Sequence, residues 1–104
     1  MLFLTYWELN EDMSVEERQQ VAQKLTSSGL FPPKGVNIIR WDGTPDGWGI
    51  LIAEAESVAD ITDAINMWRA AGAGFFKSTR TAPTQPIQDA LSRQGELLKV
   101  LASA

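Results

Sequence analysis

Apolar residues recur along the chain with two different periods, and the changes between these periods divide the sequence into seven segments. Four short runs rich in aromatic and branched residues predict strands, over residues 2–9, 36–41, 48–55 and 75–81. Three segments with helical spacing of apolar positions predict helices, over residues 14–28, 57–71 and 86–101. The order β-α-β-β-α-β followed by a helix predicts a ferredoxin-like α+β fold with a four-stranded antiparallel sheet.

Local signals support the boundaries of these segments. The sequence DGTPDG at residues 42–47 is typical of a hairpin turn between two strands. Ser14 and Glu17 have the spacing of a helix capping box, and Gly29 predicts the end of that helix. Its apolar stripe includes Val15, Ala22 and Leu25. The remaining positions form a polar face that we expect to be solvated: Glu16, Arg18, Gln19, Gln20, Gln23 and Lys24.

The predicted strands lack a consistently polar face, so both sides of the sheet need cover. Leaving about six large apolar side chains in water would forgo on the order of 10 kcal/mol, which matches the typical stability of a whole domain. Either the last helix or a second copy of the sheet, related by a two-fold axis, is expected to cover the second face. We favour a homodimer that forms a dimeric α/β barrel, with the last helix assisting at its edge.

The last helix has a short heptad pattern of apolar positions. Its seam consists of Ile87, Leu91, Gln94, Leu98 and Leu101. Two heptads are too short for a stable isolated coiled coil, so this helix is expected to dock onto another surface. We predict a single domain over residues 1–104, made of a ferredoxin-like core at 1–81 and a C-terminal helix at 82–104.

Composition excludes several kinds of function. The chain of 104 residues has no cysteine and no histidine, which excludes disulfides, Cys–His or Ser–His–Asp nucleophile systems, and histidine-ligated haem or zinc. We therefore expect no cofactor and no metal site. The net charge of −4 argues against nucleic-acid binding. No apolar run is long enough to cross a membrane and no signal peptide is expected, so we predict a cytoplasmic protein.

Several short motifs resemble those of a known family. They are the initial Met-Leu-Phe, Pro32–Val36, Arg40-Trp41, Gly47–Gly49, Glu54 before an Ala-Glu step, and Trp68. The sequence resembles, over about residues 1–81, the DUF3303 family of unknown function within the dimeric α/β-barrel superfamily. The resemblance implies the fold and a homodimer, with no assigned reaction. Relatives often carry a histidine where this chain has Asp42, so no metal or proton-transfer role is carried over.

Five residues are candidates for contact with a small molecule: Tyr6, Arg40, Trp41, Asn66 and Trp68. Strict alternation places Arg40 on the same face as Val36 and Ile38, where its guanidinium could hold a carboxylate or phosphate. An ion pair of Arg40 with Asp42, with Glu54 or with a carboxylate of the second copy is the alternative. The aromatic residues, four tryptophans among them, either wall a pocket for a flat apolar ligand or pack in the core and the dimer.

Three functions remain open from the sequence. The first is a homodimer that binds a small apolar or acidic molecule in a cleft between helices and sheet. The second is a cofactor-independent monooxygenase or isomerase, with Tyr6, Asn66 and Trp68 nearest the chemistry, by analogy of fold and residue type. The third is a structural or protein-interaction dimer that uses the last helix. Whether the protein is an enzyme is left undecided.

Overall fold

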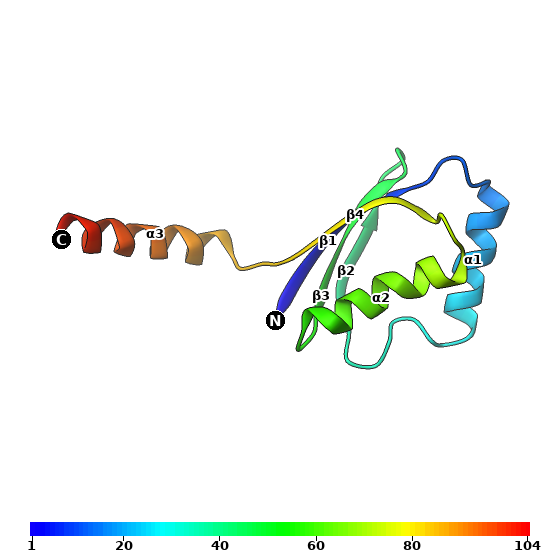
Figure 1. The fold of residues 1–104 in the computed structure, drawn as a ribbon, viewed down its shortest axis with the longest axis horizontal. Helices are drawn as coiled ribbons and strands as arrows, with labels where there is room; N and C mark the ends of the chain where they lie inside the picture. The colour runs from blue at the N-terminus through cyan, green and yellow to red at the C-terminus, as the bar shows by residue number, and fades with distance from the viewer.

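The structure, a computed structural model, describes all residues 1–104 and contains four strands and three helices (Figure 1). In chain order these are β1 (Leu2–Leu9), α1 (Val15–Ser27), β2 (Asn37–Gly43), β3 (Trp48–Glu54), α2 (Val58–Ala71), β4 (Phe76–Pro83) and α3 (Ile87–Ala102). The strands form one antiparallel sheet in the order β2-β3-β1-β4. This is the ferredoxin-like α+β fold that the sequence predicts.

Helices α1 and α2 cover one face of the sheet, and the core lies between them and the strands (Figure 1). The capping box predicted at the start of α1 is present: the Ser14 hydroxyl accepts from the Glu17 amide, and the Glu17 carboxylate accepts from the Ser14 amide. The largest buried cluster joins Phe3 of β1 to Leu51 of β3 and Ile61 of α2. A second cluster lies toward α1 and includes Trp68, which is only 5% exposed.

Strand β2 contains an irregularity that the sequence does not predict. Ile38 pairs with Ala53, and Arg40, two residues later, pairs with Ile52, so the register shifts at Ile39. An extra residue of this kind is a β-bulge. It interrupts the alternation of side chains, so that residues an odd number of positions apart can point to the same face of the sheet. Ile38 and Trp41 consequently both face the helices, because their partners Ala53 and Leu51 are buried there. Arg40 faces the opposite side, contrary to the expectation that it shares a face with Ile38.

The face of the sheet opposite α1 and α2, here called the open face, has no cover within the chain. Its apolar members come mainly from the two central strands: Leu2, Leu4, Tyr6, Trp48, Ile50 and Ile52. Leu4 and Trp48 are each 39% exposed. The composition of β1 suggests burial on both faces, but within one chain only the face toward α1 and α2 is covered. The cover that the sequence predicts for the second face is not supplied by these helices.

Helix α3 stands apart from the sheet (Figure 1). None of its residues is buried, and the molecule measures 60 × 29 × 19 Å. The Cα radius of gyration is 17.5 Å, against about 13 Å for a compact domain of this length. The docking predicted for this helix therefore does not occur on its own sheet. No helix of the structure is long and apolar enough to cross a membrane.

Candidate functional site

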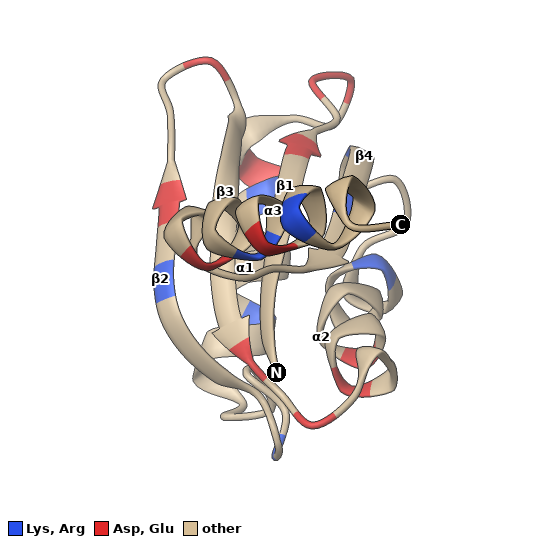
Figure 2. Ribbon diagram, turned by 90° about the vertical axis from the view of Figure 1, so that its left-hand side faces the viewer, with Lys and Arg blue, Asp and Glu red and all other residues tan.

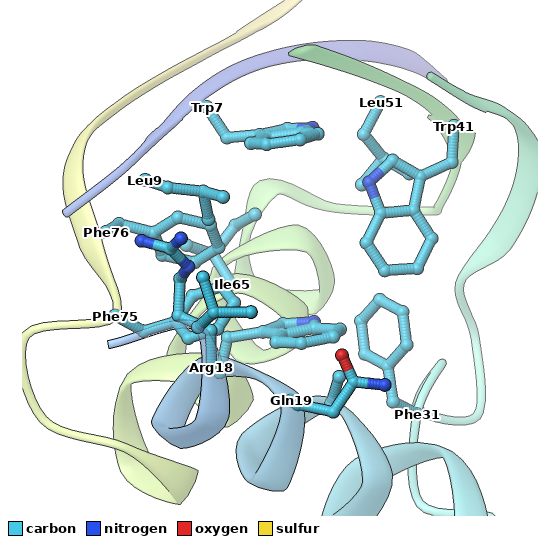
Figure 3. A pocket seen from close by; sticks show the side chains of 13 residues that line it. Trp7, Leu9, Arg18, Gln19, Phe31, Trp41, Leu51, Ile65, Phe75 and Phe76 are labelled. Atoms are coloured by element: carbon cyan, nitrogen blue, oxygen red, sulfur yellow. The ribbon is translucent and has the colours of Figure 1, made fainter. Parts of the chain in front are cut away.

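A cavity of about 360 Å³ lies between the sheet and the two covering helices (Figure 3). All four strands and helices α1 and α2 contribute to its wall, with β4 contributing only through its first residue, Phe76. Eleven of its thirteen lining residues are hydrophobic: Trp7, Leu9, Val15, Ala22, Phe31, Trp41, Leu51, Ile65, Trp68, Phe75 and Phe76. This volume is at the lower end of the range of ligand pockets, about 300–1,000 Å³. The cavity thus has the size and the apolar lining of a small-molecule site.

Aromatic rings form a continuous wall of the cavity. Phe31 contacts Trp41 and Trp68, with ring centroids 5.4 and 5.3 Å away, and Trp41 is 5.5 Å from Trp68. Phe75 extends the series at 5.0 Å from Trp68. All four pairs are tilted or edge-on rather than stacked face to face, as aromatic quadrupoles favour. The wall consequently presents both ring faces and ring edges to the cavity.

Trp7 closes the cavity on the side of the sheet, and two glycines make room for its ring. In Figure 3 it lies across the cavity from Phe31, with Trp41 at the side. A Cβ at Gly49 would overlap the Trp7 indole, and a Cβ at Gly43 would lie 3.3 Å from Trp7 Cη2. Gly43 and Gly49 are paired across β2 and β3. The hairpin therefore offers a flat backbone surface on which the indole rests.

Three polar groups interrupt the apolar lining. The indole Nε1 of Trp7 is buried and has no hydrogen-bond partner. Arg18 donates from Nη1 to the carbonyls of Asn10 and Met13, at 3.2 and 3.1 Å, and makes no ion pair. Gln19, beside it on α1, also lines the cavity. A buried donor without a partner is costly, so these groups favour a ligand that carries hydrogen-bond acceptors.

The structure brings together two of the five residues selected from the sequence. Trp41 and Trp68 line the cavity. Tyr6 and Arg40 lie on the open face, and Asn66 is exposed on α2, where its Oδ1 accepts from Arg69 at 3.2 Å. Contact of these residues with a ligand stays a prediction for all five.

The immediate surroundings of Tyr6 and Arg40 raise the pKa values of both side chains. Partial burial and the Glu8 carboxylate, to which the Tyr6 hydroxyl donates at 3.3 Å, raise the pKa of Tyr6 above its ordinary value. The hydrogen bond and charge of Asp42 raise the pKa of Arg40. Figure 2 shows basic and acidic segments close together on β2 at the edge of the sheet. Arg40 thus forms the surface ion pair that was the alternative to an anion-binding role.

Comparison with known families identifies the chain. A family model described as a domain of unknown function, DUF3303, matches residues 1–91. The chain belongs to the DUF3303 family. The match includes all residues that line the cavity. No sequence among the curated proteins matches this DUF3303 chain significantly.

Solved structures similar to the DUF3303 chain share its ferredoxin-like fold. One is 5-chloro-2-hydroxyhydroquinone dehydrochlorinase from Burkholderia phenoliruptrix AC1100, in complex with 2,5-dihydroxybenzoquinone. The similarity covers 82% of this chain and 94% of that chain, with 22% identity and a TM-score of 0.54. Another is a candidate antibiotic biosynthesis monooxygenase from Nitrosomonas europaea, with 13% identity, coverage of 82% and 96%, and a TM-score of 0.47.

Sequence reasoning did not select several residues that line the cavity of this DUF3303 protein. Arg18 and Gln19 were assigned to a solvated helix face; Gln19 is indeed exposed and Arg18 is half-buried, and both line the cavity together with Val15 and Ala22 at the i, i+3, i+4, i+7 spacing of one α1 face. Trp7 had a detectable signal, because glycines at two facing positions of a hairpin leave space for a large ring. No sequence pattern marks Phe31 as a cavity residue, because it lies in the connection between α1 and β2.

Proposed function

We propose that this DUF3303 protein binds a small, flat, largely apolar molecule with one or more hydrogen-bond acceptors in the cavity between helices and sheet. The observation that carries this proposal is the aromatic cavity itself, with the unpartnered Trp7 Nε1 in its wall. Aromatic walls favour a planar ring system, which can stack or meet ring edges. Trp7, Trp41 and Trp68 would contact the ring, and Arg18 and Gln19 would hold an acceptor or an acidic group.

The lining of the cavity favours binding over catalysis. None of its thirteen residues is a carboxylate, a tyrosine or a lysine, so the usual groups for proton transfer do not face a bound ligand. The hypothesis of a monooxygenase or isomerase relies on Tyr6 and Asn66, which lie elsewhere. The ligand of the Burkholderia structure, 2,5-dihydroxybenzoquinone, is flat and carries several oxygens, and it is of the class proposed here.

The proposal includes a homodimer as the working form of the protein. Its support is the open face, where Leu4 and Trp48 remain 39% exposed beside Ile50 and Ile52. A continuous apolar surface of this kind marks an interaction site in soluble proteins. A second copy paired through the same face would cover it on both chains at once, as two-fold symmetry requires.

The experiment that tests binding uses the four tryptophan indole N–H signals in ¹H–¹⁵N NMR spectra during titration with 2-naphthoate. The signals of Trp7, Trp41 and Trp68 are expected to shift, and Trp48 serves as an internal control because it lies on the open face. Trp7 is expected to shift furthest downfield, since its unpaired N–H gains an acceptor. Equal shifts at all four tryptophans, or none, would refute binding in the cavity.

A matched pair of variants checks the location of the site. Ala22→Phe places a ring inside the cavity and is expected to reduce the affinity for 2-naphthoate at least ~10-fold, which corresponds to about 1.4 kcal/mol. Ala59→Phe makes the same chemical change on the exposed side of α2 and is expected to leave the affinity unchanged. Comparison with neutral 2-acetylnaphthalene then measures how much the negative charge contributes through Arg18.

A further inference from the structure

Helix α3 is amphipathic but has no partner within the chain. Its apolar side is formed by Ile87, Leu91, Leu97, Leu98 and Leu101, all of them at least 45% exposed. A sixteen-residue helix with an exposed apolar stripe is marginal in water by itself, since most helical stability comes from packing of such a stripe. Packing of this stripe against another surface would therefore stabilise α3.

The connection from β4 directs α3 away from its own sheet. Strand β4 ends at Pro83, and the Thr84 amide still donates to the carbonyl of Leu2, which continues the edge pairing. Pro86 is extended, with φ −57° and ψ 138°, and a residue that precedes proline, here Gln85, also favours extended backbone. The chain consequently leaves the sheet as a nearly straight continuation of β4 (Figure 1). For α3 to lie on its own open face, the chain would have to reverse direction within residues 84–86, between β4 and α3.

The dimensions of the open face indicate what α3 covers. Four strands about 4.8 Å apart and about 25 Å long give a face on the order of 500 Å². A stable interface buries about 800 Å² of accessible surface on each partner, so contact area beyond the sheets would add to the stability of such a pair. A helix of sixteen residues adds a strip about 24 Å long and about 10 Å wide, on the order of 240 Å². Since each copy would give one helix and receive another, exchanged helices would enlarge the interface on both chains.

We infer that α3 is an exchanged arm that packs its apolar side against a second copy of this chain, beside the paired open faces. The same polypeptide thus carries an uncovered apolar sheet, an unpartnered apolar helix, and a linker that holds the two apart. The inference rests on the homodimer proposed above and adds that the helix acts between chains. It predicts that dimer affinity depends on the apolar side of α3.

Photo-cross-linking distinguishes contacts between chains from contacts within a chain. Benzoylphenylalanine is placed at the position of Leu98, and equal amounts of ¹⁵N-labelled and unlabelled full-length chains are refolded together. After irradiation and digestion, the inference expects cross-linked peptides of mixed isotopic composition. The control carries the probe at the position of Glu96, which lies about 160° around the helix from Leu98. The control is expected to give few cross-links.

Sedimentation of two charge variants supplies an independent measurement. Leu98→Asp, on the apolar side, is expected to weaken dimerisation at least ~10-fold. Lys99→Asp, its neighbour on the polar side, is expected to change it less than about 2-fold.

Cross-links confined to one chain would overturn the inference, as would an intact dimer with no cross-links and no effect of Leu98→Asp. Either result would leave the homodimer standing. A monomer at all concentrations would overturn both. The NMR titration of the cavity is unaffected by any of these outcomes.

Discussion

Tyr6 and Trp7 are neighbours in β1 and serve opposite faces of the sheet. Trp7 closes the cavity, and Tyr6 lies on the open face, with its ring centroid 5.9 Å from that of Trp48. Alternation along the strand alone causes this separation. A change at Trp7 should therefore report on the cavity, and a change at Tyr6 on the open face.

The ionisation of Tyr6 gives a direct test of its surroundings, because it is the only tyrosine of the chain. Partial burial and Glu8 raise its pKa above 10.0, while Arg80 and Lys77 oppose this shift. A pH titration of phenolate absorbance is expected to show a midpoint above that of free tyrosine, and Glu8→Gln is expected to lower it. An ordinary midpoint, unchanged in Glu8→Gln, would contradict the observed environment.

The sign of the linked stability follows from this shift. A raised pKa means that the folded state holds the phenolic proton more tightly than the unfolded chain does. Tyr6 therefore contributes stability that is complete below the unfolded pKa of about 10. This contribution is lost as the pH rises through the folded pKa. Cover by a second copy would raise the folded pKa further, because burial disfavours the phenolate.

At the scale of elements, features that depend on a few neighbouring residues could be predicted from the sequence. Features that depend on how strands pair could not. The capping box of α1 and the turn signals at residues 42–47 are local, and both the helix and the hairpin form, although β2 continues to Gly43 and shortens the turn. The bulge at Ile39 arises from the fit of β2 to β3, and no residue type announces it. For that reason strict alternation placed Arg40 on the wrong face, whereas Trp41 and Trp68 were selected as candidates by residue type alone.

Arg18 shows a second limit of sequence reasoning. A polar side chain that lines a cavity and one that faces bulk water have the same place in a helical pattern. Only the packing of α1 over the sheet distinguishes them, because it turns the face with Arg18 and Gln19 toward the aromatic wall. The aromatic composition of the site was thus foreseeable, and its polar edge was not.

The hairpin of β2 and β3 should be intolerant of a side chain at Gly49. Gly49→Ala would place a methyl group against the Asp42 carbonyl and the Trp7 indole, so we expect a loss of about 1–3 kcal/mol in the free energy of unfolding. Urea unfolding measures this loss. Gly95→Ala is the matched control, since nothing lies within 4 Å of the added methyl group and a helix interior gains from the change. Equal effects of the two variants would contradict the close packing of Trp7.

At the scale of the whole molecule, two apolar surfaces remain uncovered: the open face and α3. The radius of gyration is 17.5 Å, and both surfaces lie exposed to solvent in the single chain. Folding and association are consequently expected to be coupled, because burial of these surfaces supplies a large part of the stability. The sequence foresaw the need for cover but did not foresee that α3 points away.

Coupling of folding and association predicts a thermal midpoint that rises with protein concentration. Between about 1 and about 100 µM the midpoint is expected to increase by several degrees, as mass action requires for a dimer. Leu4→Lys on the open face should lower the midpoint and reduce its dependence on concentration. Val58→Lys, at a position that is 59% exposed on α2, should change neither. A midpoint independent of concentration in the unmodified protein would rule out an obligate dimer.

The bulge at Ile39 also affects how this scaffold can diverge. It puts the two halves of β2 out of phase, so that Ile38 and Trp41 look inward although they are three positions apart. If β2 paired regularly with β3 and kept all its residues, the guanidinium of Arg40 would point toward the cavity and the indole of Trp41 toward the open face. Because Asp42 shares a face with Arg40 and pairs with it, the same change would turn this ion pair toward the cavity and make its lining more polar.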